Sequence, residues 1–342
     1  MKNKSLSKNL FFSRTHDFLE MYLPAQAGKS LKTVKAYKDA LSVFRKYVHE
    51  ENGYSIMDFH YEDCTYEFIL YFSRYLTEKK NYAPSSVNQR LAAIKSYLRY
   101  AADCDICIQQ IYFNVMNVPF ISVPKLIRPV IENDALKDML EAPGNNKFGV
   151  RDRMMLVLLF DAAIRLDELL SLKLSSLNLQ AETPYIRVLG KGNKERIVSL
   201  RKATIGHVKR YLQMFHKNEI DLSQYFFYTV IHDKRNKMSE RNAERIVKKY
   251  ADIIREKHPS LPDNVYPHMF RRTRATGLYR DGVDIELISR ILGHASTQTT
   301  RIYAIPSLEM LKEAMEKGVE ADDHEALWKG HEDELAALCG LR

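Results

Sequence analysis

Apolar residues in this chain recur at intervals of three and four positions, and this spacing constrains the fold more than any other feature. A helix over residues 33–49 would collect on one face the side chains of Val34, Tyr37, Leu41, Phe44 and Val48. A helix that begins near residue 85 would in the same way collect Val87, Leu91, Ile94 and Leu98. A strand would instead alternate with a period of two. The spacing therefore predicts a protein built mainly of helices.

A proline-containing segment interrupts this pattern. Residues 118–130 include Pro119, Pro124 and Pro129, and proline lacks a backbone N–H and disfavours helix in the residue before it. We therefore predict a helical domain over 1–117, a linker over 118–130, a second domain over 131–305 and a helical tail over 306–342. The 342 residues, with a hydrophobic content of 45%, suffice for a core in each domain.

In the first domain we expect helices over 11–23, 33–49 and 65–78, and a fourth that Ser85 or Ser86 caps. Basic residues should lie on the outer faces of these helices. Such a face suits contact with a nucleic-acid backbone, and it is equally typical of a face exposed to solvent. Both interpretations stay open for this domain on its own.

In the second domain we expect a helix capped by Asn133 or Asp134 and a buried helix within 148–174. Two runs of strand-forming residues, 185–189 and 196–200, flank a turn rich in glycine and lysine and predict a β-hairpin. Further helices are expected over 202–215, 239–256, 268–280 and 285–292. The predicted fold class is mainly α with a small β-sheet.

The charge is unevenly distributed along the chain. The net charge is +9, of which the first 303 residues contribute +15 and the rest contribute −6. A basic body favours a polyanionic partner, because each lysine or arginine that meets a phosphate releases a counterion. A solvated basic surface without a partner is the alternative. The acidic tail is expected to contact protein, either its own domain or a neighbour.

Other classes of protein find little support. Four cysteines in a chain of this length do not form a disulfide framework, and Cys104 and Cys107 lack the further ligands of a zinc site, so we expect no metal and no cofactor. The apolar run 154–160 is too short to span a membrane. The N-terminus has no apolar signal segment, which favours a cytoplasmic protein.

Near the C-terminus a histidine and a tyrosine, His294 and Tyr303, lie nine residues apart in LGHASTQTTRIY. Gly293 should end one helix and Ser296 should cap the next. Upstream, His268 and Arg271 form an H-x-x-R motif. Cleavage of a DNA phosphodiester without metal needs fixed cations at the non-bridging oxygens, a nucleophile and proton donors. Arginine suits the first task because its planar fork can bind two oxygens.

Further stretches complete this set, namely AAIRLDE around Arg165 and GKGNKER around Lys191. Together the motifs closely resemble those of the tyrosine recombinases, the phage-integrase and Xer-type enzymes. The resemblance is strong over 150–305 and weaker over 11–110. The first motif usually reads T-G-L-R in that family, and here it contains Ala163 in place of glycine. The H-x-x-R motif usually has leucine where Phe270 stands. Neither difference removes a reactive group.

The resemblance implies a role for each matching residue. Tyr303 attacks the scissile phosphate and forms a 3′-phosphotyrosyl link, while Arg165 and Arg271 hold the non-bridging oxygens. Lys191 protonates the leaving 5′-oxygen. His268 assists proton transfer at the nucleophile.

His294 would then donate a hydrogen bond to the phosphate, and Glu168 would orient an arginine or support the fold. The resemblance also implies a helical core-binding domain, which clamps DNA, ahead of the catalytic domain. Residues expected to contact DNA are Lys35, Arg90, Lys95, Arg99, Lys194, Arg196 and Arg272.

The implied function is strand exchange between two specific double-stranded DNA sites through a Holliday junction. A homotetramer would carry it out, with the tail exchanged between protomers, and the length of the tail favours a mobile-element integrase. One alternative is a type IB topoisomerase-like enzyme, which would act as a monomer. Another is an architectural DNA-binding protein with an inactive site, which would have no use for the nucleophile.

Overall fold

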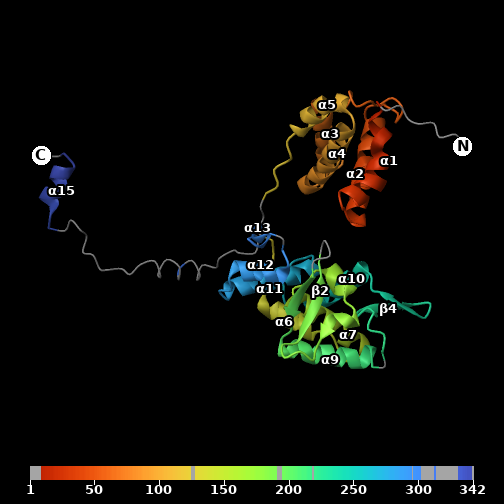
Figure 1. Cartoon of the computed structure of the whole chain (residues 1–342). Coiled ribbons are helices and arrows are strands. Elements are labelled where there is room, and N and C mark those ends of the chain that lie inside the picture. The colour runs from red at the N-terminus through yellow and green to blue at the C-terminus, as the bar shows by residue number, and fades with distance from the viewer. Residues whose placement is uncertain are drawn as a thin grey trace. The chain divides into compact units, whose positions relative to one another are not determined.

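The computed structural model describes residues 9–124, 128–190, 195–217, 219–294, 296–301, 312 and 330–340. The chain forms two compact units, Met1–Ile127 and Arg128–Arg342, and each is described by itself (Figure 1). Their boundary lies within the proline-containing segment 118–130. Helices dominate both units and the strands form small antiparallel sheets. The predicted fold class, mainly α with a small β-sheet, is confirmed.

Long helices build the described part of the first unit. They are α2 (Leu31–Glu50), α3 (Tyr66–Glu78), α4 (Pro84–Cys104) and α5 (Gln109–Met116), with the 3-10 turn η3 (Ile106–Ile108) before α5. The helices expected over 33–49 and 65–78 are thus present, and Ser30 and Thr65 cap them. The helix α5 was not predicted. The predicted serine cap of α4 is wrong: Pro84 occupies the first turn, where a missing N–H costs nothing, and Ala83 precedes it without a side-chain cap.

The segment expected as one helix over 11–23 is instead irregular. It consists of η1 (Phe11–Arg14), α1 (Thr15–Asp17) and the π-helical η2 (Phe18–Gln26). Pro24 lies inside η2 and has no N–H to donate, and the N–H of Ala27 bonds the carbonyl of Tyr22, five residues back. Phe11 and Phe18 are fully buried and pack edge-on against Tyr97 of α4, so this segment closes the aromatic core of the unit.

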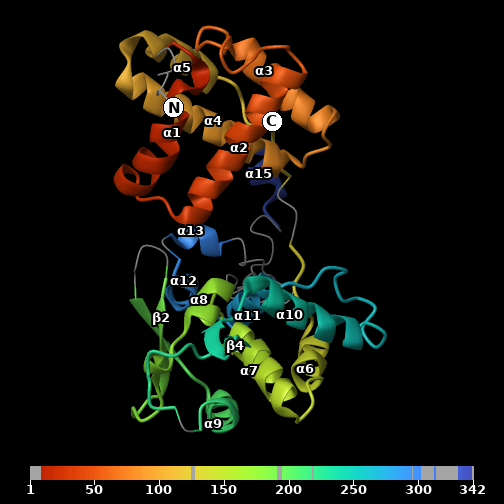
Figure 2. The same ribbon diagram turned by 90° about the vertical axis from the view of Figure 1, so that its right-hand side faces the viewer.

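The second unit is arranged around a buried helix. Its helices are α6 (Asn133–Glu141), α7 (Lys147–Asp161), α8 (Leu166–Ser171), α9 (Lys202–Phe215), α10 (Glu240–Ile254), α11 (Pro267–Arg280), α12 (Ile285–Leu292), α13 (Thr297–Thr300) and α15 (Glu332–Leu338), with a 3-10 turn η4 (Leu174–Ser176). Helix α7 packs against α6, α8, α9 and α11 (Figure 2). Its residues 154–159 are buried all round, which explains their uninterrupted apolar sequence.

One expectation for these helices needs correction. The buried helix expected within 148–174 is α7; the backbone then turns at Ala163, where φ is 47°, before α8 begins. The N-cap of α6 is Glu132, which makes no side-chain capping bond, so neither Asn133 nor Asp134 holds that position. The helix expected over 239–256 is α10, and Ser239 caps it.

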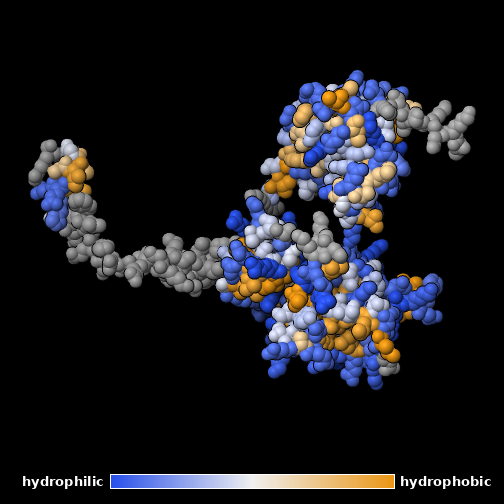
Figure 3. All heavy atoms as spheres, viewed as in Figure 1, coloured by the Kyte–Doolittle hydropathy of each residue, from blue (hydrophilic) through white to orange (hydrophobic). Residues whose placement is uncertain are grey.

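The predicted β-hairpin is present. Strands β1 (Leu177–Asn178), β2 (Tyr185–Leu189) and β3 (Glu195–Ser199) form an antiparallel sheet in which Val188 pairs with Arg196. A second hairpin, β4 (Tyr228–Ile231) and β5 (Lys234–Lys237), was not predicted. It projects from the unit, and its visible surface is largely hydrophilic (Figure 3).

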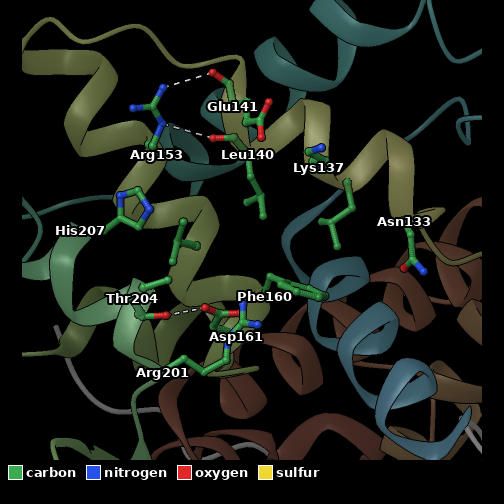
Figure 4. Close-up of a pocket in the computed structure, with 13 residues that line it drawn as sticks. Asn133, Lys137, Leu140, Glu141, Arg153, Phe160, Asp161, Arg201, Thr204 and His207 are labelled. Carbon is green, nitrogen blue, oxygen red and sulfur yellow. Dashed lines mark hydrogen bonds and ion pairs between the residues drawn. The ribbon is translucent and has the colours of Figure 1, made fainter. Parts of the chain in front are cut away.

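Among the residues that the structure describes, no helix combines the length and the apolar character needed to cross a membrane. Cys104 and Cys107 are exposed thiols without a disulfide. A cleft of about 550 Å³ lies between α6, α7 and α9, and Asp161 and Arg153 line it together with Phe160 (Figure 4). None of the predicted site residues lines this cleft.

Candidate active site

Arg165 is placed by the turn between α7 and α8. Ala163 is fully buried with φ at 47°, and Arg165 follows as the extended N-cap residue of α8. The backbone N–H of Arg165 donates to Oε2 of Glu168 at 2.9 Å, and its Nη1 donates to Oε1 at 2.8 Å. The side chain of Arg165 remains 37% exposed. One acidic residue, three positions along, therefore fixes both the backbone and the guanidinium of Arg165, while part of the guanidinium still faces solvent.

Glu168 is a buried carboxylate that serves two arginines. Arg196 donates to Oε1 at 3.1 Å and to Oε2 at 2.8 Å. Burial by itself would raise the pKa of Glu168, but the hydrogen bonds and charges of Arg196 and Arg165 outweigh it and lower the pKa to about 2. Glu168 is thus ionised at neutral pH, and each of its oxygens accepts one hydrogen bond from each arginine.

Arg271 is fully buried in α11 and ties two segments of the site together. Its Nη1 donates to the carbonyl of Ala163 at 2.6 Å and its Nη2 donates to the carbonyl of Leu292 at 2.5 Å. The first carbonyl precedes Arg165 by two residues and the second precedes His294 by two. The left-handed conformation of Ala163 turns its carbonyl toward this guanidinium. Arg271 therefore holds the backbone that leads into Arg165 and the backbone that leads into His294.

His268 lies one turn before Arg271 at the start of α11, and part of its side chain is exposed. The pKa of His268 is lowered to about 4, first because the ring is partly removed from water and then because Arg271, Arg272 and Arg165 place positive charge nearby. At neutral pH the imidazole is therefore neutral and can accept a proton.

His294 follows the C-terminus of α12. Gly293 takes the left-handed conformation, with φ at 62°, and ends α12 as the sequence predicted. Ser296 accepts from the N–H of Gln298 and caps α13, also as predicted. Nδ1 of His294 and Oγ1 of the buried Thr300 lie 2.8 Å apart. Two short helices and one hydrogen bond thus set the orientation of the ring.

The four predicted residues that the structure describes come together in the second unit, from three parts of the sequence. The pKa of His294 is lowered to about 4, first by partial burial and then by the charges of Arg271, Arg165 and His268. Nη2 of Arg165 also reaches the carbonyl of Gly293 through a long contact of 3.4 Å. Two cationic forks and two neutral imidazoles therefore share one electropositive region.

Lys191, Lys194 and Tyr303 lie outside the described residues. Their neighbours in sequence are described. Strand β2 ends at Leu189, β3 begins at Glu195, and α13 ends at Thr300. Strand β3 is joined to the arginine cluster through Arg196, and Thr300 contacts His294, so the elements that flank the lysine turn and the tyrosine both reach the site.

The expected DNA-contacting residues differ in exposure. Lys35 and Arg99 are exposed, as expected, and Arg90 is half-buried with its guanidinium 4.3 Å from the ring centroid of Tyr82. The expected outward placement of Lys95 is wrong. Its side chain is buried and its Nζ donates to the carbonyls of Met116 and Val118, at 3.0 and 2.5 Å. Helix α4 packs against α5 on that side, and the sequence did not predict α5.

Arg272 and Arg196 are likewise not on the surface. Arg272 is buried and donates at 2.8 Å both to the carbonyl of Pro129 and to the hydroxyl of Tyr266. Arg196 is committed to Glu168, with 13% of its side chain exposed. Sequence reasoning missed Thr300 as a partner of the site, and it expected Arg196 to contact DNA rather than Glu168. The TT pair before Tyr303 was a signal for Thr300, but a hydrogen bond to His294 cannot be inferred from spacing.

Within the described ranges, no group of three histidine, cysteine, aspartate or glutamate side chains is placed to hold a metal ion. The described arginines can bind a phosphate, and the neutral imidazoles can transfer protons. The expectation that the chain needs no cofactor stays a prediction.

Comparison with known proteins identifies both units. Residues 129–310 match the phage integrase family, and residues 16–103 match the N-terminal SAM-like domain of phage integrases. Tyrosine recombinase XerA of Pyrococcus horikoshii is 31% identical over 290 residues, which is 85% of this chain and 88% of that protein. Tyrosine recombinase XerC of Natranaerobius thermophilus is 29% identical over 296 residues, 84% of this chain and 92% of that protein.

Solved structures share the fold. XerH bound to a palindromic difH substrate has a TM-score of 0.66 at 21% identity, covering 84% of this chain and 80% of that chain. A lambda integrase dimer bound to a COC′ core site has a TM-score of 0.59 at 17% identity, covering 86% and 94%. The family match covers more than half of the chain and agrees with the motifs and their geometry. The chain therefore belongs to the phage integrase family, the tyrosine recombinases, which are site-specific enzymes of DNA strand breakage and rejoining.

Proposed function

We propose that this chain cleaves DNA with Tyr303 as the nucleophile. The tyrosine oxygen attacks the phosphorus, a 3′-phosphotyrosyl bond forms, and the bond to the 5′-oxygen breaks. The tyrosine proton passes to His268, and Lys191 supplies a proton to the departing 5′-oxygen. The covalent link keeps the energy of the phosphodiester, so the reverse reaction reseals a strand without a nucleotide cofactor.

The observation that carries this proposal is the convergence of Arg165 and Arg271 with neutral imidazoles. Negative charge grows on the non-bridging oxygens in the transition state, and guanidinium groups that are already held in place stabilise it without reorganising. The lowered pKa of His268, about 4, leaves its ring neutral and able to accept the tyrosine proton. Neither feature is needed by a protein that only binds DNA.

The hydrogen bond between His294 and Thr300 supports a defined role for His294. If the Thr300 hydroxyl donates to Nδ1, the ring proton resides on Nε2. The Nε2–H can then donate to a phosphate oxygen. The lowered pKa keeps this neutral tautomer populated at physiological pH.

We further propose double-stranded DNA with specific sites as the partner, a homotetramer on two such sites, and strand exchange through a Holliday junction. XerH and lambda integrase, which share the fold, were solved on DNA substrates. The exposed Lys35 and Arg99 are the proposed phosphate contacts in the first unit. A topoisomerase-like activity remains the second candidate, and a product that joins two different duplexes distinguishes recombination from it.

The test is a covalent trapping assay. Wild-type protein first selects its preferred sequence from a random duplex library. A duplex of that sequence is then nicked beside the scissile phosphate, so that the short 5′-hydroxyl fragment diffuses away after cleavage. With EDTA present, wild type should form an SDS-resistant adduct and Tyr303→Phe should bind without forming one. An adduct with Tyr303→Phe would identify another nucleophile, and no adduct with either protein would contradict the proposed chemistry.

We also propose that the natural sites belong to a mobile genetic element. The residues beyond 310 lie outside the family match, and this extra tail is the support for the proposal. Expression of the protein beside its own flanking DNA should then yield a circular excision product, detected by outward-facing primers. Resolution of a chromosome dimer without such a circle would contradict the mobile-element role and leave the recombinase activity intact.

A further inference from the structure

Arg196 points into the second unit rather than toward a DNA surface. It is the second residue of β3, directly after the turn that carries Lys191, and it pairs with the buried Val188 of β2. Alternate residues of a strand face the same side, so Arg196 shares its side with the buried Val198. From the sequence we expected Arg196 only to contact DNA.

The guanidinium of Arg196 completes the hydrogen bonding of Glu168. Oε1 of Glu168 accepts from Nη1 of Arg165 at 2.8 Å and from Nη1 of Arg196 at 3.1 Å. Oε2 accepts from the backbone N–H of Arg165 at 2.9 Å and from Nη2 of Arg196 at 2.8 Å. A bidentate pair of this kind fixes orientation as well as distance. Rotation of Glu168 would break bonds to both arginines at once.

The side chain of Arg196 also supports the turn before His294. A Cβ placed on Gly293 would lie 2.8 Å from Cδ and 2.9 Å from Nη1 of Arg196. A side chain at position 293 would therefore require the guanidinium end of Arg196 to shift. The carbonyl of Gly293 in turn faces Nη2 of Arg165 at 3.4 Å. Arg196 thus links strand β3, to which it belongs, with the start of α8 and with the turn that leads to His294.

The charges explain why a second arginine is useful. Glu168 paired with Arg165 alone would neutralise the cation that the phosphate needs. With Arg196 present, the three side chains carry a net charge of +1, because Glu168 shares its negative charge between two guanidiniums. Arg165 then keeps both a fixed position and positive charge.

We propose that Arg196 is a positioning residue for DNA cleavage, which acts through Glu168 on Arg165 and through Gly293 on the turn of His294. This inference rests on the proposed function of Arg165 and His294 at the phosphate. It replaces the direct DNA contact that the sequence suggested for Arg196. The reaction itself is unchanged, and Arg196 touches none of the reacting atoms.

The first experiment compares Arg196→Gln with wild type on the nicked duplex, at protein concentrations that saturate the DNA. We expect the single-turnover cleavage rate to fall about 10- to 100-fold, as for other residues that orient a catalytic group, while the Kd for DNA changes less than about threefold. Arg196→Lys should recover part of the rate, because it keeps the charge and loses the fork. Arg187→Gln is the control: Arg187 is exposed on the opposite face of the same hairpin, and its cleavage rate should equal that of wild type.

A double-mutant cycle identifies the route. If Arg196 acts largely through Glu168, the loss of rate in the double variant Arg196→Gln with Glu168→Gln should be clearly smaller than the product of the two single losses. Independent losses that multiply would contradict the route. A wild-type rate for Arg196→Gln would also contradict it. Weaker DNA binding with an unchanged rate at saturation would contradict it too, and would show that Arg196 contacts DNA directly. Thermal melting and the stoichiometry of DNA binding show for each variant the fraction that is folded.

A modified substrate separates Arg196 from Lys191. A 5′-bridging sulfur leaves readily without a proton, so a duplex carrying it should restore cleavage by Lys191→Ala. It should not restore Arg196→Gln, because the loss there is at the non-bridging oxygens. Restoration of Arg196→Gln would show that Arg196 acts through the lysine turn and would overturn the proposed route. An adduct with wild type and an equal rate for Arg196→Gln would refute this inference alone, whereas the absence of any wild-type adduct would refute the proposed function.

Discussion

Ala163 adopts a backbone conformation that residues with a side chain rarely take, and the site depends on it. Its φ is 47°, and its carbonyl accepts from Nη1 of Arg271. The left-handed region costs a residue with a Cβ about 1–2 kcal/mol, so the contacts around it must offset this. Its methyl group packs in a small cluster with Ala275, Ile288 and Leu292. Alanine is the smallest residue that both fills this space and tolerates the turn.

Ala163→Val should therefore lower the free energy of unfolding much more than Ala162→Val does. Both alanines are buried, but Ala162 has an ordinary helical backbone, with φ at −82°. We expect both variants to suffer from overpacking and Ala163→Val to lose about 2 kcal/mol more, because a branched side chain fits the left-handed region poorly. Urea denaturation measures the difference. Equal losses would show that the turn is not strained.

The lowered pKa values of His268 and His294, about 4 in each case, make a prediction about pH. Between pH 6.5 and 4 an unfolded histidine takes up a proton that these native side chains do not, so the folded state should lose stability as the pH falls through this range. Their neutral forms should persist to about pH 5, and the cleavage rate should show no titration near 6.5. A single-turnover pH profile tests this, and an apparent pKa near 6.5 that His268→Gln removes would contradict it.

The positions of some basic residues could be predicted from the sequence, and the positions of others could not. Arg165, His268, Arg271 and His294 were predicted because motif spacing identifies them, and the structure brings these four together. The burial of Lys95 and Arg272, and the low exposure of Arg196, were not predicted. Each is held by carbonyls or by a carboxylate from elsewhere in the chain, and a pattern of local spacing contains no information about such partners.

Among the elements, α12 and its end hold the histidine turn. Asp284 caps its first turn by accepting from the N–H groups of Glu286 and Leu287, at 2.7 and 3.2 Å, and Gly293 closes its last turn. The glycine serves two purposes, since it supplies the left-handed backbone and leaves room for Arg196. These two purposes can be measured separately.

Gly282→Ala and Gly293→Ala form a matched pair for this measurement. Both glycines have positive φ, 79° and 62°, but a Cβ on Gly282 would meet no atom within 4 Å. Gly282→Ala should therefore show the backbone cost alone, about 1–2 kcal/mol. Gly293→Ala should cost at least about 1 kcal/mol more, because Arg196 must move. In an Arg196→Ala background this excess should vanish, and its persistence would assign the cost to another contact.

Elements with a strong period or a turn marked by glycine were predicted, and those defined by turns without glycine were not. Helices α9 and α12 begin and end where the sequence indicated, because one apolar face extends along each. The hairpin of β4 and β5 was missed because its turn residues, His232 and Asp233, both take positive φ without the glycine that usually marks such a turn. The turn between α7 and α8 was not predicted for the same reason, since Ala163 is not a typical turn residue.

For the whole molecule, the charge distribution predicts how the protein binds DNA. The first 303 residues carry a net +15, and phosphate contacts by such a body release counterions. The Kd should therefore rise steeply with salt, and the slope of log Kd against log salt should decrease by about one unit in Lys35→Ala. Lys95→Ala should leave the slope unchanged, because Lys95 is bonded to carbonyls inside the first unit. Fluorescence anisotropy over a range of salt concentrations makes the comparison, and an equal change in both slopes would place Lys95 at the DNA.

The tail supplies the last prediction. Helix α15 begins with Glu332, Asp333 and Glu334 and exposes Leu335 and Leu338, and the residues after 303 carry a net −6. An acidic helix with exposed leucines is unsuited to DNA and suited to a protein surface. Truncation after Pro306 should therefore preserve DNA binding and adduct formation on a single site, and tighten binding slightly because it removes like charge from the DNA.

The same truncation should weaken the assembly of two DNA-bound sites into one complex. Native gels with two labelled duplexes, with light scattering as a second measure, would show loss of the paired complex while single-site binding persists. The matched control is Leu335→Ser with Leu338→Ser in the full chain, which removes the apolar contact and keeps the charge. If the truncated protein lost stability and paired sites normally, the tail would pack on its own domain and the proposed exchange between protomers would be wrong.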